Sequence, residues 1–286
     1  MVQINKLLKY FLYPASILYG ILAFIKNFFY DIKLLKAKQL PCSVISVGNI
    51  TSGGTGKTPT VLYLCKTLQQ GGRKNIGIIS RGYGRGTKGM FLVSKGDGPL
   101  ASWESTGDEP FMMAKKTRNI PIVVDSDRYR GGEFLHRHFN TEIIILDDGF
   151  QHRSLYRNLN IVLINGDSLP SDYQFLPFGF LREPWSSLKR ADAVIFTKSK
   201  PRQFLFNKIK KSDVPYFSSY MKSFISFHSL SRKKQLKNLT GEKVVLLSGI
   251  GHPKSFEKTI RDYNCVIEGH EVFRDHYSYN KSDIFK

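Results

Sequence analysis

The chain has 286 residues, 41% of them hydrophobic, which is enough for one large or two modest globular domains and argues against wholesale disorder. Its 43 Lys and Arg residues against 23 Asp and Glu give a formal net charge of +20, which predicts an anionic partner: nucleotide, nucleic acid or an acidic membrane surface. None of the three cysteines forms a C-x-x-C pair, which argues against a disulfide framework or a zinc site and favours a reducing, cytosolic setting.

Residues 1–38 are predicted to form a membrane-associated helix. The stretch YFLYPASILYGILAFI (10–25) carries no charge, and the whole segment holds six lysines against one aspartate, a net charge of +5. Basic flanks attract anionic headgroups, while apolar and aromatic side chains bury at the membrane interface. The uncharged run is shorter than the roughly 20 residues that a spanning helix needs. A helix lying in the membrane surface is therefore favoured over a short span or a helix buried in the protein core.

After residue 38, short β-branched runs alternate with helical stretches such as Thr60–Gln70, which predicts a doubly wound, mostly parallel α/β/α sheet. Several of the runs are continuously apolar, as expected of strands covered by helices on both faces. The expected strands are Ser43–Val47, Ile76–Ser80, Ile120–Asp125, Glu142–Leu146, Ile161–Asn165, Ala193–Thr197 and Val244–Ser248.

A domain boundary is expected near residues 213–240, where the sequence alternates and turns basic without a helical period. The predicted organisation is a larger α/β domain at 39–215, a β-strand linker at 216–241 and a smaller C-terminal α/β domain at 242–286. The Lys/Arg-rich run at 232–237 is either a solvated face or a binding patch, and the first is the commoner case.

The stretch TSGGTGKT (51–58) is close to the phosphate-binding pattern G-x-x-x-x-G-K-[ST], with Thr51 in the place of the first glycine. It follows a β-branched run, and Pro59 suits the first turn of a following helix. Backbone N–H groups of such a loop surround phosphate oxygens at a positively polarised helix terminus. Lys57 would hold the terminal phosphates of a nucleotide, and the Thr58 hydroxyl would ligate Mg²⁺. The full candidate set is Thr51, Ser52, Gly53, Gly54, Thr55, Gly56, Lys57 and Thr58.

The stretch TEIIILDDGFQH (141–152) is an apolar strand ending in two carboxylates, the form of a Walker B element. Because adjacent strand residues point to opposite faces, Asp147 and Asp148 are expected to have different roles, one holding Mg²⁺ and the other orienting the loop. The alternative is an acidic strand-to-turn pair without a ligand.

Three other loops leave alternatives open. In TGDEP (106–110), Asp108 or Glu109 either caps a helix or accepts the proton of an attacking hydroxyl. The loop SRGYGRG (80–86) either binds phosphate or is simply flexible. In EVFRDHYSY (271–279), the pair Asp275–His276 is either structural or catalytic.

Taken together, these stretches resemble the tetraacyldisaccharide 4′-kinase (lipid A 4′-kinase) family of Gram-negative bacteria. The resemblance rests on GNITSGGTGKTP, SRGYG, TGDEP, LDDGFQH, LPFGFLREP (176–184), FTK (196–198), SGIGHP (248–253) and FRDHYSY, and it covers about residues 10–280. The family loop is itself a threonine-first version, which accounts for Thr51. The resemblance implies transfer of the ATP γ-phosphate to the 4′-hydroxyl of tetraacyldisaccharide 1-phosphate, giving lipid IVA, by a peripheral enzyme on the cytoplasmic face of the inner membrane.

The resemblance also implies roles for individual residues. Asp108 matches the proposed base, aided by His276, while Lys57 and Thr58 keep their phosphate and Mg²⁺ roles. Asp147 and Asp148 match the acidic pair near the metal, Asp147 as its ligand and Asp148 as a catalytic residue. The remaining residues expected to line a nucleotide cleft between the two domains are Glu109, His152, Arg182 and Glu183. Family members commonly continue for several tens of residues past the Asp-His motif, so either this sequence is a fragment or its C-terminus is unusually short.

Two rival classes are weaker. A partner-switching ATPase with a deviant phosphate loop would carry a lysine just before the two glycines, where this chain has Ser52. A nucleic-acid-binding protein is suggested by charge alone, since no nucleic-acid motif is evident in the sequence. We therefore expect ATP and Mg²⁺ as cofactors, an anionic acylated disaccharide as substrate, a membrane surface as partner, and neither nucleic acid nor an obligate protein partner.

Overall fold

The computed structural model describes residues 6–220, 238–250, 253–274, 277 and 279–284. They belong to two compact units, Met1–Tyr220 and Met221–Lys286. The strands are β1 (Ser43–Asn49), β2 (Ile76–Ser80), β3 (Phe91–Ser94), β4 (Ile122–Val124), β5 (Ile143–Asp147), β6 (Leu159–Asn165), β7 (Ala193–Thr197), β8 (Tyr216–Ser218), β9 (Lys243–Ser248) and β10 (Val266–Val272). The helices are α1 (Lys6–Asp31), α2 (Lys57–Gln70), α3 (Trp103–Thr106), α4 (Asp108–Lys116), α5 (Arg128–Phe139), α6 (Gln203–Lys210), α7 (Pro253–Arg261) and α8 (Lys281–Ile284), with 3₁₀-helices η1 (Pro170–Tyr173) and η2 (Trp185–Arg190).

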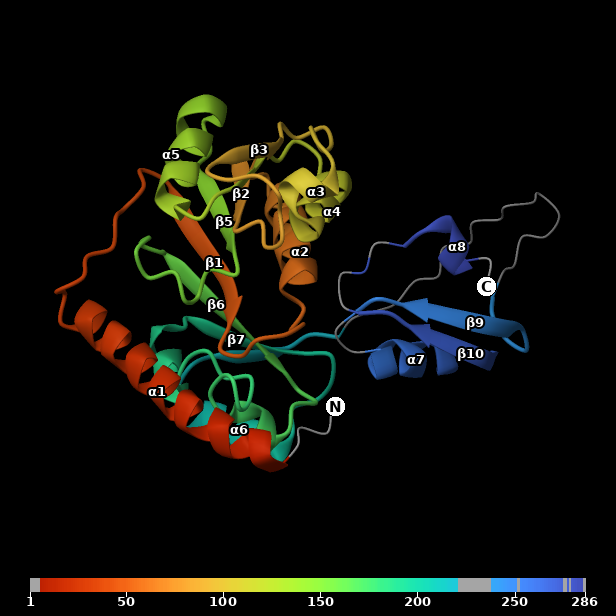
Figure 1. Ribbon diagram of the computed structural model, residues 1–286. Coiled ribbons are helices and arrows are strands. Elements are labelled where there is room, and N and C mark those ends of the chain that lie inside the picture. The colour runs from red at the N-terminus through yellow and green to blue at the C-terminus, as the bar shows by residue number, and fades with distance from the viewer. Residues whose placement is uncertain (1–5, 221–237, 251–252, 275–276, 278, 285–286) are drawn as a thin grey trace. The chain divides into compact units, whose positions relative to one another are not determined.

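The described part of the first unit is built on one eight-stranded sheet in the order β3-β4-β2-β5-β1-β6-β7-β8 (Figure 1). Every neighbouring pair is parallel except β3–β4 at one edge. Strand β1 lies between β5 and β6, so the loop that follows it opens at the carboxyl edge where the strand order reverses. Open α/β sheets bind ligands at this edge. The predicted mostly parallel α/β fold is confirmed.

Helices cover both faces of the sheet because its central strands are apolar on both sides. In β5, Ile145 packs with α2 and α4 side chains on one face, while Ile144 and Leu146 pack with Leu135 of α5 on the other. All of these side chains are fully buried. Each contributes on the order of 1.5–3 kcal/mol through removal of its apolar surface from water. This packing fixes the strand ends that carry the candidate site.

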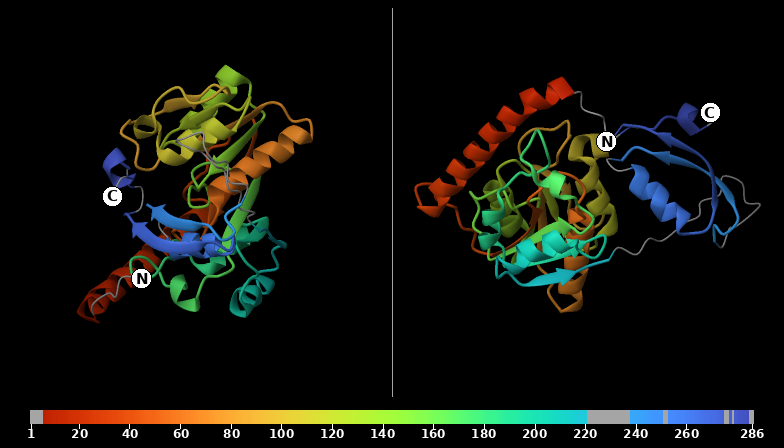
Figure 2. Two further views of the ribbon diagram at one scale, coloured as in Figure 1. Left: turned by 90° about the vertical axis from the view of Figure 1, so that its right-hand side faces the viewer. Right: turned by 90° about the horizontal axis from the view of Figure 1, so that it is seen from below.

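Helix α1 lies along the outside of the first unit in all three views (Figures 1 and 2). Near the middle of the helix, the Ser16 hydroxyl donates a 2.7 Å hydrogen bond to the Phe175 carbonyl. At Gly20 the helix approaches the Phe175 ring so closely that a Cβ would lie 2.7 Å from a ring carbon. Near its end, Arg153 pairs with Asp31 at 2.7 Å. The predicted N-terminal helix is therefore present and docks along most of its length.

The described part of the second unit contains β9 and β10, which pair in parallel, and helices α7 and α8. Ser248 and His270 share a 2.8 Å hydrogen bond, and the other His270 nitrogen lies 3.4 Å from Glu257. These contacts tie both strands to α7. Strand β8 is an edge strand of the main sheet, so residues 216–218 of the predicted linker belong to the first unit. Residues 221–237, with the basic run at 232–237, lie outside the described residues, so the linker boundaries stay a prediction.

Candidate active site

The loop between β1 and α2, residues 50–56, is held open by its neighbours. The Asn49 amide donates to the Thr55 hydroxyl at 2.9 Å, and the Thr197 hydroxyl donates to the Thr55 carbonyl at 2.8 Å. Gly56 has φ of 85°, a left-handed conformation in which glycine carries no steric cost. A Cβ built at Gly54 would meet nothing within 4 Å. Open space therefore lies over the crest of the loop.

Thr51 replaces glycine because it forms part of an extended bridge. It pairs with Leu181 as an isolated antiparallel bridge, and the next residue, Ser52, donates its backbone N–H to the Phe180 carbonyl at 2.6 Å. A residue in an extended bridge needs no left-handed conformation, so a side chain is tolerated there. Thr51 in place of glycine thus has a structural role: its bridge to Leu181 attaches the phosphate loop to the segment that carries Arg182.

Three charged groups from separate segments meet beside the loop. The Asp148 carboxylate lies 3.7 Å from Lys57 Nζ, and Arg182 Nη1 lies 3.0 and 3.1 Å from its two oxygens. Although burial raises the pKa of Asp148, Lys57 and Arg182 outweigh that effect and hold the pKa below its ordinary value. Asp148 is therefore a carboxylate, and it holds the Lys57 ammonium at the entrance of the loop.

Asp147 has a different environment from its neighbour. Asp148 has φ of 50°, so the chain turns sharply after the strand and the two carboxylates diverge. Ser80 donates a 2.8 Å hydrogen bond to Asp147 Oδ2, whereas within the described residues the buried Oδ1 has no hydrogen-bond partner. Burial, followed by the charge of Glu109, raises the pKa of Asp147 to about 7. Because Oδ1 has no partner among the described residues, Asp147 can offer this oxygen to a cation at the site.

The Thr58 hydroxyl lies close to a second carboxylate. It donates to Glu109 Oε1 at 3.2 Å. Thr58, Glu109 and Asp147 supply only oxygen ligands, the kind that Mg²⁺ prefers. Among the residues that the structure describes, no three His, Cys, Asp or Glu side chains gather into a metal-binding cluster. A Mg²⁺ ion at a nucleotide site fits these donors nonetheless, because it takes one or two protein ligands and completes its shell with water and phosphate oxygens.

Asp108 is the first residue of α4, as the sequence predicted for a helix start. Its side chain is exposed, and Oδ1 accepts a hydrogen bond from the Glu109 N–H at 2.9 Å. Gly107 is the N-cap residue and no side chain caps α4, so the capping interpretation of Asp108 is wrong. The contact with Glu109 lies within the first turn and leaves the carboxylate reachable from solvent, which fits the base interpretation.

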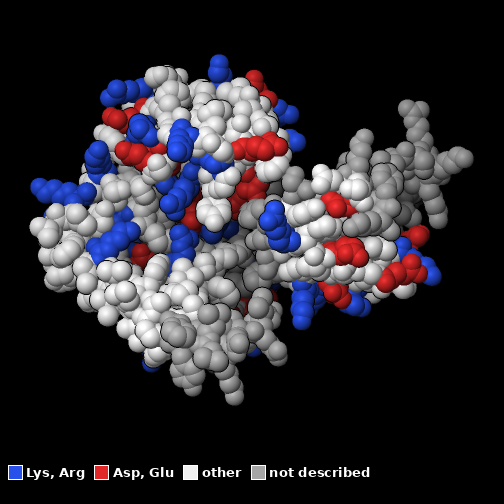
Figure 3. Space-filling view, viewed as in Figure 1, with Lys and Arg blue, Asp and Glu red and all other residues white. Residues whose placement is uncertain are grey.

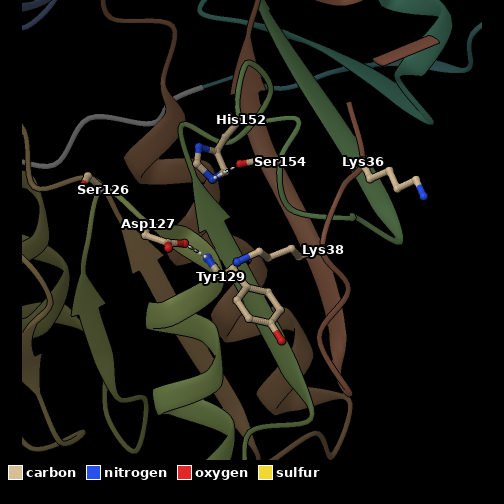
Figure 4. A pocket seen from close by; sticks show the side chains of 7 residues that line it. All are labelled: Lys36, Lys38, Ser126, Asp127, Tyr129, His152 and Ser154. Carbon is tan, nitrogen blue, oxygen red and sulfur yellow. Dashed lines mark hydrogen bonds between the residues drawn. The ribbon is translucent and has the colours of Figure 1, made fainter. Parts of the chain in front are cut away.

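His152 lines a recess of about 430 Å³ together with residues from three segments (Figure 4). Its Nε2 lies 2.9 Å from the Ser154 hydroxyl. Burial, then the charges of Arg128 and Arg157, lower the pKa of His152 to about 4. It is thus neutral at physiological pH. The other lining residues are Lys36, Lys38, Ser126, Asp127, Tyr129 and Ser154.

Sequence reasoning missed Arg128, which links this recess to the acidic pair. The side chain is buried and its Nη1 donates to the Ser126 carbonyl at 3.0 Å. Burial and the charge of Arg81 lower the pKa of Arg128 to about 10, while Asp148 and Asp147 act in the opposite direction. The available signal was an arginine directly after the acidic turn DSD (125–127), in a loop at the carboxyl edge of the sheet.

Glu183 and Arg182 face different surroundings. The buried Glu183 carboxylate accepts hydrogen bonds from Asn27 at 2.6 Å and Ser187 at 2.8 Å, and it lies 3.4 Å from Arg190. These contacts hold α1 and η2 together, which argues against the predicted cofactor role of Glu183. Asp275 and His276 lie outside the described residues, so the predicted role of His276 stays a prediction.

Comparison with known proteins identifies the family of the chain. The family model for tetraacyldisaccharide-1-P 4′-kinase matches residues 8–286. Tetraacyldisaccharide 4′-kinase from Aquifex aeolicus is 38% identical over 274 residues, covering 96% of this chain and 84% of the relative. The enzyme of the same name from Halothermothrix orenii is 37% identical, covering 99% and 78%.

A solved structure gives the same result in three dimensions. The crystal structure of the "apo" form of LpxK from Aquifex aeolicus in complex with ATP superposes with a TM-score of 0.79 at 37% identity, covering 96% of this chain and 84% of that one. The chain therefore belongs to the tetraacyldisaccharide 4′-kinase family, the ATP-dependent kinases of lipid A biosynthesis.

Proposed function

We propose that this chain binds ATP at loop 51–58 and transfers the γ-phosphate to the 4′-hydroxyl of tetraacyldisaccharide 1-phosphate, giving lipid IVA, at the cytoplasmic face of the bacterial inner membrane. The observation that carries the proposal is the open phosphate loop, with Lys57 held at its entrance by Asp148. A triphosphate in this loop would accept hydrogen bonds from backbone N–H groups at the start of α2. Lys57 would then move from Asp148 to the more highly charged phosphates.

Thr58 and Asp147 are the residues that would hold Mg²⁺, with Glu109 beside them. The support is the unpartnered Asp147 Oδ1 and the 3.2 Å contact between Thr58 and Glu109. When bound, the ion neutralises charge on the β- and γ-phosphates. Arg182 acts on Asp148, fixing the carboxylate whose distance from Lys57 sets the position of the ammonium.

Asp108 is the base in this proposal. The 4′-hydroxyl proton passes to the Asp108 carboxylate as the hydroxyl oxygen bonds to the γ-phosphorus. The bond between that phosphorus and the β–γ bridging oxygen breaks, and ADP leaves with the electron pair. Exposure of Asp108 at the start of α4 supports this role, because a lipid-borne alcohol has to reach it. His276 is assigned to assist by the family resemblance alone.

The recess around His152 supports an anionic acceptor. Lys36 and Lys38 line it, and Figure 4 shows Lys38 over the Tyr129 ring, with Nζ 4.9 Å from the ring centroid. His152, neutral at physiological pH, can hydrogen-bond sugar hydroxyls without adding charge. A disaccharide phosphate would find both kinds of group here.

Helix α1 supports a position in the membrane surface. By length and hydropathy alone, Leu12–Asp31 could cross a bilayer. However, its small and polar side chains Ser16 and Asn27 face the protein, whereas Leu18, Leu22 and Phe24 are each more than half exposed. A helix on a water-facing surface would have the opposite orientation. Because the unit contacts α1 from Tyr13 to Asp31, the helix would lie in the interface with its apolar face in the lipid.

The test is ATP consumption by the full chain in neutral detergent micelles, with and without tetraacyldisaccharide 1-phosphate. We expect turnover only with the acceptor, and its loss on chelation of Mg²⁺ followed by recovery on re-addition. An equal rate of ATP consumption with and without the acceptor would support an ATPase of another class and contradict the proposal.

A further inference from the structure

Segment 36–38 meets segment 152–156 at an isolated bridge between Lys38 and Leu155. Lys38 donates its N–H to the Ser154 carbonyl at 2.8 Å, and Tyr156 donates back to the Lys38 carbonyl at 2.8 Å. His152 and Ser154 line the recess described above. Arg153, Leu155 and Arg157 line a second cavity of about 590 Å³. The two cavities are therefore neighbours, and Lys36 lines both of them.

The second cavity is cationic. Lys33, Lys36, Arg153 and Arg157 line it, with Tyr30, Leu35, Ala37, Leu155, Tyr156 and Asn160 as the other lining residues. Arg153 pairs with Asp31, but among the described residues no carboxylate forms an ion pair with Lys33, Lys36 or Arg157. Figure 3 shows Lys and Arg side chains gathering on this side of the first unit. The cavity thus carries positive charge that the described part of the protein does not neutralise.

Exposed apolar side chains surround this charge. Ile32, Leu34 and Leu35, which follow the last turns of α1, are 52%, 67% and 42% exposed. On the helix itself, Phe28 and Phe29 continue the same apolar surface. Lysines among aromatic and aliphatic side chains at the end of an interfacial helix are placed at the depth of lipid headgroups.

From this arrangement we propose that the cavity lined by Lys33, Lys36, Arg153 and Arg157 binds the phosphate headgroup of an anionic glycerophospholipid of the surrounding membrane. The phosphate would accept hydrogen bonds from Lys33 and Lys36, while the acyl chains lie along Ile32, Leu34 and Leu35. Arg153 and Arg157 donate to protein oxygens and would contribute positive charge. The inference rests on the proposed position of α1 in the membrane surface.

The experiment counts lipids on the full chain. The protein in neutral detergent is mixed with short-chain phosphatidylglycerol, or with phosphatidylcholine as the neutral reference, and retained lipid is measured by native mass spectrometry. We expect one phosphatidylglycerol per chain and little retained phosphatidylcholine. Lys33→Glu should weaken retention at least about ten-fold, because each charge near an anionic headgroup contributes on the order of 1 kcal/mol. Lys33→Arg should retain the lipid.

Two further variants distinguish binding of the lipid inside the cavity from general attraction of the lipid to positive surface charge. Ala37→Phe fills the cavity without altering charge and should abolish retention, whereas Lys66→Glu, on the exposed face of α2, should not. Equal retention by wild type, Lys33→Glu and Ala37→Phe would overturn the proposal, as would equal retention of both lipids. Displacement of phosphatidylglycerol by tetraacyldisaccharide 1-phosphate would also overturn it, by assigning the cavity to the acceptor.

Phosphate transfer in neutral micelles is the independent readout. Lys33→Glu should leave it unchanged there, because no glycerophospholipid is present. A wild type that retains phosphatidylglycerol but transfers no phosphate would contradict the proposed function and leave the lipid site standing. A wild type that transfers phosphate but retains neither lipid would contradict the lipid site and leave the proposed function standing.

Discussion

Arg182 and Lys57 share the carboxylate of Asp148: Arg182 Nη1 contacts both oxygens, at 3.0 and 3.1 Å, while Lys57 Nζ lies 3.7 Å from one of them. The loop before Arg182 also pairs with the start of the phosphate loop through the Thr51–Leu181 bridge. The segment with Leu181 and Arg182, which is distant in sequence, thus positions both the backbone of the phosphate loop and the Asp148 carboxylate that contacts Lys57.

Arg182→Ala should lower kcat/KM by about ten- to a hundred-fold. Without the guanidinium, Asp148 attracts Lys57 more strongly and holds it away from the γ-phosphate. Steady-state kinetics with the lipid acceptor measures this, with Arg137→Ala on the exposed face of α5 as the matched control. Wild-type kinetics in Arg182→Ala would remove Arg182 from the site.

Asp108→Asn tests Asp108 as the base. Asparagine keeps an oxygen that can accept from the Glu109 N–H, so the melting temperature should stay near that of wild type. Loss of the base should lower kcat by about a hundred- to ten-thousand-fold. ATP affinity, measured by calorimetry, should change by no more than about two-fold. The control is Asp97→Asn in an exposed loop; near-normal kcat in Asp108→Asn would remove Asp108 from the base role.

Glu183→Ala should destabilise the first unit by about 3 kcal/mol without weakening ATP binding. The substitution leaves Arg190 buried without its carboxylate and removes the acceptor for Asn27, so α1 loses an anchor. Thermal unfolding and ATP titration measure the two effects, and Glu183→Gln, which keeps the shape, should be milder. Lost ATP affinity with an unchanged melting temperature would restore the cofactor role that the sequence resemblance implied.

The fold was largely predictable from the sequence, because the central strands β1, β2, β5 and β7 are apolar on both faces and leave little choice of structure. The predicted strand ranges for β2 and β7 coincide with those observed. The edge strand β3 and strand β10 were missed, and β8, within the predicted β-strand linker, was not expected to join the main sheet. Edge strands are short and lack the continuous apolar pattern of the core, so tertiary pairing rather than local sequence decides them.

The site was predictable where backbone geometry demands particular residues, as in the glycines of loop 51–56 and the acidic end of β5. Long-range partners were harder to predict. Arg128 reaches the site through packing of a distant segment, and its local signal is the acidic turn that precedes it. Glu183 shows the converse: it adjoins Arg182 in sequence, but extended chain turns it toward α1.

The low pKa of His152 makes stability depend on pH. Its folded pKa of about 4 lies below the unfolded value of about 6.5. Between these values the unfolded chain binds a proton that the folded chain does not, so stability falls as the pH drops through this window. After allowance for partial exposure, His152 contributes about 1 kcal/mol to this loss.

The comparison of wild type with His152→Gln isolates this contribution. Between about pH 7.5 and pH 5, the melting temperature of wild type should fall by about 2–4 °C more than that of the variant. Equal falls in the two proteins would mean that His152 titrates normally in the folded state.

The most direct test of the central claim follows a radiolabelled γ-phosphate from ATP onto tetraacyldisaccharide 1-phosphate, in wild type and Lys57→Ala. We predict a labelled lipid whose label survives mild acid hydrolysis, since that treatment removes the anomeric phosphate and spares an ester at the 4′ position. Lys57→Ala should transfer at least about a hundred-fold more slowly while keeping its melting temperature and its binding to anionic liposomes. Label that is lost with the anomeric phosphate, or unimpaired transfer by Lys57→Ala, would contradict the account.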